Sequence, residues 1–367
     1  MSQSAIQDAV TLRVNGVDYG GWKEVEISAG IERQSRDFTL GVTRNWPGAT
    51  DIPRVIRQGD LCEVYIGADK LLTGYVDATP IRYDGKSVSV GVKGRSKTAD
   101  LVDCSAVHKT GQWRNAKIER IAADLAKPFG IEVIAEASTG AALVEHQIEP
   151  GETVFECIDR LLTLRQMLST DDADGHMIFI SVGSGGSAAT KLEYGKNILS
   201  AEAALDYKDV FSHYTVKGQR AGTDESCGPQ ANEVTASVAD SNIRRHRPLL
   251  IKQEGQVDTQ ICAERASAER AYRAAKALET TYTVQGWRQA DGKLWLPNQL
   301  VRVTDPVIGF DGEMLIVEVT WRLSESGATA QLKVGPTEGY IPTPDAQKKK
   351  KHAKEFGEPW KDAKAIK

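Results

Sequence analysis

The sequence predicts a β-rich α+β protein in which two similar small β-barrel domains are separated by an α+β region. Alternation of apolar and polar residues, which is typical of half-buried strands, fills the first part of the chain and returns in its last third. Between these two parts, helical patterns alternate with short strands. We expect domains at 1–94 (first barrel), 95–195 (α+β), 196–335 (second barrel) and 336–367 (a flexible, lysine-rich tail).

The first domain, 1–94, is predicted to consist of short strands without helices. Val25 and Ile27 alternate with glutamates, and Asp84-Gly85 favours a tight hairpin between two strand patterns. Many short strands without helices indicate a small barrel or a sandwich. Further strand patterns cover 38–42, 61–66, 71–76 and 87–92.

Helix signals mark the region 95–195. Asn115 is expected to cap a helix over 116–126, and Thr153 with Glu156 forms the pattern of a capping box at the start of a second helix. The small, polar composition of Gly183–Thr190 is typical of a flexible linker. The apolar face of the first helix is expected to contain Ile118, Ile121, Ala122 and Leu125.

The last domain, 196–335, combines strands with one long helix. A strand is expected over 209–217, a polar loop insertion over 221–232 and a helix rich in Ala, Glu and Arg over about 259–278. The tail after Pro336 contains Lys348–Lys351 and is expected to be exposed and mobile. Further strands are expected over 280–287, 300–304, 314–321 and 328–334.

Two clusters of strand patterns look alike at a separation of about 240 residues. Leu61–Val64 and Leu72–Val76 correspond to Leu300–Val303 and Leu315–Val319, and each cluster ends on a further strand. Any two half-buried meanders share some of this patterning, so the repeat stays a hypothesis. If the repeat holds, a trimer of such chains would present a six-fold-like ring of barrels, because closed cyclic assemblies are the usual oligomers.

Composition limits the classes of function. The chain of 367 residues has 46 basic and 50 acidic side chains and a net charge of −4, which argues against a general polyanion binder. No apolar run approaches the length of a membrane-spanning helix, and the N-terminus lacks the pattern of a secretion signal. Reduced thiols are expected for the five scattered cysteines, Cys62, Cys104, Cys157, Cys227 and Cys262.

Motifs for catalysis are missing, and we predict no catalytic, cofactor-binding or metal-binding residues. Asp172, Asp174 and Gly175 match a calcium loop poorly and favour a hairpin turn instead. Gly183-Ser184-Gly185 leaves no room for the helix that a dinucleotide loop needs. The six histidines are scattered, although a triad or a carboxylate pair formed in space stays open, since sequence order does not reveal either.

Three tryptophans are the candidates for binding residues. Trp46, Trp287 and Trp295 lie in or beside expected loops, and tryptophan is favoured at interaction hot spots. Core packing is the alternative for each of them. The basic cluster Arg244–Arg247 lacks the interleaved aromatic residues of a nucleic-acid surface and favours a solvated face.

Several segments together resemble the baseplate hub proteins of Mu-like contractile-tailed phages. They are Gly94–Ser105 (GRSKTADLVDCS), Gly151–Glu156 (GETVFE), Val284–Arg288 (VQGWR) and Leu294–Val301 (LWLPNQLV), and the resemblance extends from about Val10 to Gly335. It implies a homotrimer, similar to the T4-type central hub, in which two barrels per chain build a pseudo-six-fold ring. Such a ring joins the six-fold tail tube to the three-fold central spike and surrounds the DNA exit channel.

A structural virion protein, made in the host cytoplasm and located in the tail baseplate, is therefore the first hypothesis. The expected partners are two further copies, the spike, the tail tube and other baseplate proteins, with DNA passing without sequence-specific binding and no membrane insertion. A tail-associated cell-wall hydrolase is the alternative, and it requires a cleft with suitably spaced carboxylates. A DNA-contacting channel protein is a third possibility, against which the acidic balance argues.

Overall fold

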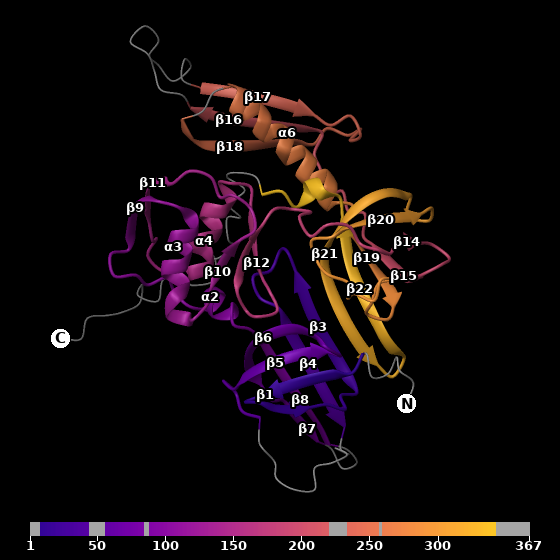
Figure 1. Cartoon of the computed structure of the whole chain (residues 1–367). Coiled ribbons are helices and arrows are strands. Elements are labelled where there is room, and N and C mark those ends of the chain that lie inside the picture. Colours follow the sequence, from indigo (N-terminus) through magenta and orange to yellow (C-terminus); the bar gives the residue numbers. More distant parts are fainter. Residues whose placement is uncertain (1–7, 44–55, 84–87, 220–232, 257–258, 343–367) are drawn as a thin grey trace, which may run out of the picture.

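The computed structural model describes residues 8–43, 56–83, 88–219, 233–256 and 259–342 (Figure 1). Its largest element is a 14-stranded sheet, and three smaller sheets have three, two and three strands. Helices cover two of the smaller sheets. The β-rich α+β class predicted from the sequence is confirmed.

The first half of the large sheet comes from the N-terminal part of the chain. Its strands are hydrogen-bonded in the order β3-β4-β8-β6-β5-β1-β2, with β7 added to β8. Val25 and Ile27 are buried and the intervening Glu26 is exposed, as the alternation predicts. Asp84-Gly85 lies outside the described residues. The strands are β1 (Val10–Val14), β2 (Val17–Tyr19), β3 (Glu24–Gly30), β4 (Asp37–Thr43), β5 (Leu61–Ile66), β6 (Asp69–Ala78), β7 (Ile81–Tyr83) and β8 (Val88–Ser96).

The second half comes mainly from the C-terminal part. Its strands follow the order β15-β19-β22-β21, and β20 lies between β21 and β14. Gly183–Thr190 is not the flexible linker that its composition predicts, because the backbone N–H of Ala188 donates to Leu300 O and that of Gly183 to Asn298 Oδ1. The strands are β14 (Leu192–Glu193), β15 (Ile198–Ala203), β19 (Thr280–Gln285), β20 (Leu300–Asp305), β21 (Phe310–Ser324) and β22 (Gly327–Gly335), after which the 3₁₀ turn Thr337–Gly339 follows.

Strands β3 and β21 pair antiparallel and join the two halves into one sheet. Ile27 lies opposite Trp321 in this seam, and both side chains belong to a core shared by the two halves. Within the described residues, strand pairing closes neither half into a barrel. The prediction of two separate barrels is therefore not confirmed: the described strands form two halves of one continuous sheet, because the seam extends the first half directly into the second.

The order of pairing repeats between the halves. The first contains β3-β4-β8-β6-β5 and the second β15-β19-β22-β21-β20 in the same succession. A register shift interrupts β6 after Val76 and β21 after Ile316, which are corresponding positions. This agreement in topology and irregularity supports the internal repeat proposed from the sequence.

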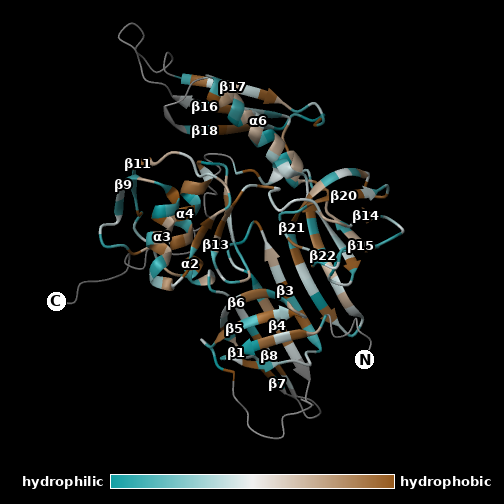
Figure 2. Cartoon of the chain, in the orientation of Figure 1, coloured by the Kyte–Doolittle hydropathy of each residue, from teal (hydrophilic) through white to brown (hydrophobic). Residues whose placement is uncertain are grey.

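The α+β region packs helices on a small sheet of order β10-β13-β12 (Figure 2). Thr153 and Glu156 form the predicted capping box at the start of α4. Asn115 does not cap α3, because it lies in β9 with a positive φ of 47° and Lys117 is the N-cap. The apolar face predicted for α3 is buried. The elements are α2 (Ala99–Asp103), β9 (Gln112–Ala116), α3 (Ile118–Ala126), the 3₁₀ turn Lys127–Phe129, β10 (Val133–Ala135), β11 (Leu143–Gln147), α4 (Val154–Thr163), β12 (Leu168–Asp171) and β13 (Met177–Ile180).

The third small sheet carries the long helix. Helix α6 (Thr259–Lys276) covers one face of the sheet, and Tyr214 and Val216 are buried beneath it, as their alternation predicts. The predicted loop 221–232 and the tail beyond residue 342 lie outside the described residues. Among the described helices, none has the length and apolar content needed to span a membrane. The strands are β16 (His213–Gln219), β17 (Glu233–Ala239) and β18 (Pro248–Gln256), in the order β17-β16-β18.

Candidate assembly surfaces

The loop between β19 and β20 holds two of the three candidate tryptophans. Trp287 and Trp295 are both buried in the shared core, and the indole N–H of Trp287 donates to the backbone oxygens of Arg322 and Thr329, each at 3.0 Å. Their burial within the chain corresponds to the core-packing alternative. Trp46 lies outside the described residues, so its role stays a prediction.

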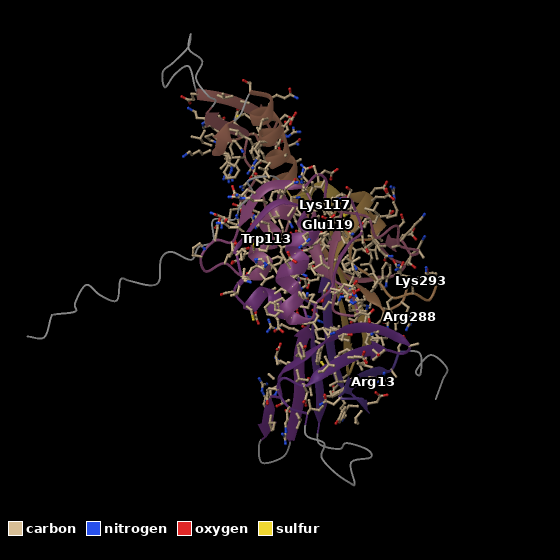
Figure 3. All side chains as sticks on the ribbon, turned by 60° about the vertical axis from the view of Figure 1, so that its left-hand side comes forward. Arg13, Trp113, Lys117, Glu119, Arg288 and Lys293 are labelled. Carbon is tan, nitrogen blue, oxygen red and sulfur yellow. The ribbon has the colours of Figure 1, made fainter. Side chains whose placement is uncertain are left out.

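Arg288, in the same loop, ties the second half of the sheet to the first. Its guanidinium pairs with Asp69 at 2.7 Å and with Asp8 at 3.0 Å, and it also donates to Ile66 O. Figure 3 labels Arg288 and Lys293 in this loop and shows Arg13 on the first half below them. Sequence patterns do not reveal this contact, because Asp69 and Arg288 are 219 residues apart.

A second junction fixes the α+β region to the first half of the sheet. The carboxylate of Asp171 is buried and accepts from the backbone N–H and the Nε of Arg36, at 3.0 and 3.2 Å. Arg36 also donates to Leu71 O at 2.7 Å, and Thr73 donates to Ala173 O at 2.8 Å. These bonds hold the β12–β13 hairpin of the α+β region against β6 of the first half.

The polar face of the β3–β21 seam is a shallow groove of about 370 Å³. Arg322 pairs with Glu26 at 3.0 Å across the seam, and Arg33 pairs with Asp37 at 2.6 Å. Burial raises the pKa of the Asp37 carboxyl although the Arg33 charge opposes that change. Three basic and three acidic side chains line the groove, so it carries no concentration of one charge.

Comparison with known proteins identifies the family. Three family models match: the N-terminal domain of Mu phage baseplate assembly protein GpP at 9–96, the second domain of baseplate hub protein gp44-like at 98–181, and the fourth domain of GpP at 258–343. Baseplate hub protein gp44 of Escherichia phage Mu is 32% identical over 353 residues, which cover 94% of this chain and 92% of that protein. The chain belongs to this baseplate hub family.

Solved structures agree with the assignment. The 43 kDa tail protein of prophage MuSo2 from Shewanella oneidensis is 34% identical, with a TM-score of 0.82 over 92% of this chain and 100% of that one. The tail protein of Neisseria meningitidis MC58 is 22% identical, with a TM-score of 0.75 over 92% and 98% of the two chains, and shows the same fold. The resemblance noted in the sequence is therefore confirmed.

One Cys–His pair in this hub-family chain has the spacing of a catalytic dyad. Cys157 Sγ and His146 Nε2 are 3.2 Å apart and both residues are buried. Burial raises the pKa of the Cys157 thiol to about 12 and lowers the pKa of the His146 imidazole. The pair therefore rests as thiol and neutral imidazole, whereas a cysteine nucleophile requires a lowered thiol pKa.

The acidic turn between β12 and β13 is a hairpin, as predicted. Asp172 Oδ1 accepts from the backbone N–H groups of Asp174 and His176, both at 2.9 Å, and its Oδ2 contacts His176 Nδ1 at 2.8 Å. Asp174 pairs with Lys70 on β6. These ligand-type atoms lie near one another, but their bonds serve the turn and the junction with the first half.

The basic cluster before β18 is partly structural. Arg247 donates through Nε to Val210 O and lies over the ring of Phe211 at 5.2 Å, so it braces the α6 unit. Arg244 and Arg245 are exposed, as expected for a solvated face. The cluster therefore combines one packing residue with two surface charges.

Proposed function

We propose that the chain is a structural hub of a contractile phage tail that assembles as a homotrimer. Three copies would form a pseudo-six-fold ring of barrel-like halves, joining the six-fold tail tube to the three-fold central spike around the DNA exit channel. The observation that carries the proposal is the repeated order of strand pairing, because it gives each chain two similar units. Membership of the baseplate hub family supports it.

We propose further that the polar face of the β3–β21 seam lines the channel, where its paired charges would make a passive wall. Arg322 with Glu26 and Arg33 with Asp37 neutralise one another, so a passing polyanion would meet no concentrated positive field. DNA would pass without sequence-specific binding. We place the protein in the tail baseplate of the virion, after synthesis in the host cytoplasm, and assign it no enzymatic activity, in line with its structural relatives.

The four-part division of the chain remains part of the proposal. Family models that end at 96 and begin at 98 support a boundary near residue 94 between the first barrel-like unit and the α+β unit. We propose that the α+β unit, from residue 95 to about 181, and the α6 sheet within 196–335 pack outside the ring. The predicted boundary at 195 is too late, because β14 pairs with β20 in the second half of the large sheet. The predicted tail does not begin at 336, because Tyr340 is buried and its hydroxyl donates to Glu279 Oε1 at 2.8 Å, while residues beyond 342 lie outside the described residues.

Native mass spectrometry and sedimentation test the trimer. We expect a species of three times the mass of one chain at micromolar concentration, because obligate assemblies bury large interfaces of about 2,000 Å² or more. A stable monomer under these conditions would refute the proposal. Mixing with the spike protein is expected to yield a complex of equal copy numbers, and clearing of purified peptidoglycan by the isolated chain would instead favour the hydrolase.

A further inference from the structure

The internal repeat makes β15 the counterpart of β3 and makes β6–β7 the counterpart of β21. The pairing registers establish both correspondences. In the β7–β8 and β21–β22 pairs, Ile81↔Val90 and Arg82↔Ser89 match Trp321↔Ala330 and Arg322↔Thr329. In the β15–β19 and β3–β4 pairs, Ala203↔Thr280 and Glu202↔Thr281 match Ile27↔Phe38 and Glu26↔Thr39.

Within the described residues, a seam of paired strands is present at one of the two equivalent positions that the repeat creates. Strand β3 covers β21 inside the chain, whereas in the described part β15 pairs only with β19 and β7 only with β8. The uncovered positions are correspondingly exposed. Ile81 is 65% and Val90 41% exposed, while their counterparts Trp321 and Ala330 are 0% exposed. Figure 1 shows the two uncovered strands on separate parts of the molecule.

We propose that β15 of one copy pairs antiparallel with β7 and the end of β6 of a second copy, in the register of the β3–β21 seam. The internal seam sets Trp321 opposite Ile27 and Arg322 opposite Glu26. The corresponding contacts between copies place Ile81 opposite Ala203 and Arg82 opposite Glu202. This inference rests on the proposed function, which supplies the ring of copies, and it specifies the strands and residues that close that ring.

Charge complementarity favours a second copy of the chain as the partner of the β6–β7 edge. Inside the chain, Arg322 and Glu26 form an ion pair at 3.0 Å across the seam. The counterparts Arg82 and Glu202 are both exposed, and neither takes part in an ion pair with another described residue. An arginine on the β6–β7 edge and a glutamate on β15 thus repeat the charges of the internal seam, and opposite charges directly across a strand pair are stabilising.

The backbone of the β6–β7 edge is suited to the same pairing. The backbone oxygen of Pro80 accepts from the N–H of Gly91 at 2.9 Å, so the backbone polar groups of Pro80 face β8. Proline has no N–H to donate, and because this position faces β8, the open edge loses no donor. Polar groups of alternate residues face opposite sides of a strand, so the N–H and C=O of Ile81 face outward. In the internal seam, the corresponding side of β21 bonds to the segment that continues β3, since Val317 O accepts from the N–H of Ile31 at 2.9 Å.

Charge reversal tests the register. We expect Arg82→Glu and Glu202→Arg each to weaken association of the full chain by about tenfold or more, and the double variant to restore it, as measured by sedimentation velocity. Arg114→Glu, which changes an exposed arginine on β9, is the matched control and should leave association unchanged. Association that is unaffected by either single reversal overturns the proposed pairing.

Cross-linking tests the apolar pair independently. Ile81→Cys and Ala203→Cys variants, mixed and oxidised, should give a disulfide-linked pair of chains that neither variant gives alone, with the oxidised wild-type chain as the control for native cysteines. A trimer that forms no such cross-link and tolerates both charge reversals overturns the seam while leaving the proposed function intact. A wild-type chain that remains monomeric overturns both.

Discussion

Replacing Asp171 with alanine is expected to loosen the junction between the α+β region and the first half of the sheet. Asp171 is 2% exposed and supplies the counter-charge for Arg36, whose side chain is also mostly buried. Removing one partner of a buried ion pair costs about 3–5 kcal/mol. Arg36 keeps its bonds to Leu71 O and to the backbone oxygen of residue 171, so we expect about 3 kcal/mol, at the lower end of that range.

Asp174→Ala is the matched control, because it removes another carboxylate of the same hairpin that also pairs across the junction. Asp174 is 53% exposed, and a surface ion pair contributes about 0–1 kcal/mol. Urea unfolding followed by tryptophan fluorescence compares the two variants, with limited proteolysis to detect separate opening of the α+β region. An Asp171→Ala variant no less stable than Asp174→Ala would refute the assigned role of the buried pair.

Three further predictions follow from burial. Trp295→Ala is expected to lower the free energy of unfolding by about 3–5 kcal/mol, whereas Lys293→Ala, at an exposed position of the same loop, should change it by less than about 0.5 kcal/mol. Because burial lowers the pKa of His146, its contribution to stability is present above its ordinary value of 6.5 and is lost as pH falls, so thermal unfolding between pH 5 and 8 should show a slope that His146→Gln reduces. Cys62 and Cys157, whose thiol pKa values burial raises to about 12, should resist an aromatic disulfide reagent at pH 8 in the native protein, and rapid labelling would contradict their burial.

Local signals in the sequence predicted local structure well. The capping box of Thr153 and Glu156 and the buried face of α3 depend on residues within one or two helical turns, and both are present. Asn115 was predicted wrongly because an asparagine that tolerates positive φ suits the end of a β-strand as well as a helix cap. The prediction of a flexible linker at Gly183–Thr190 was wrong, because composition does not reveal hydrogen bonds to residues that are distant in the sequence.

The candidate surfaces could be predicted less well, because they depend on contacts between segments that are distant in the sequence. Trp287 and Trp295 were interface candidates because their flanking residues favour loops, but the shared core of the two sheet halves encloses both rings. The ion pairs of Arg288 with Asp69 and of Arg36 with Asp171 join units that periodicity treats separately. The repeat was visible in the sequence because it consists of strand patterns, whereas the β3–β21 seam depends on register and was not.

The residues of the β3–β21 seam differ from those of the proposed seam between copies, and the order in which the two would form explains the difference. The β3–β21 seam forms as one chain folds, so it can contain large apolar side chains such as Trp321 and Ile27 without exposing them. An edge strand that is exposed before assembly can pair with the wrong chain. Natural edge strands prevent this with charges, prolines and few large apolar residues. The β6–β7 edge has Pro80 and Arg82 beside its one exposed isoleucine, and β15 presents Glu202 beside the small Ala203. Pairing between copies would then depend more on the Arg82–Glu202 ion pair than the internal seam depends on its charges. Rising salt should therefore weaken association of the chains and leave the β3–β21 seam intact.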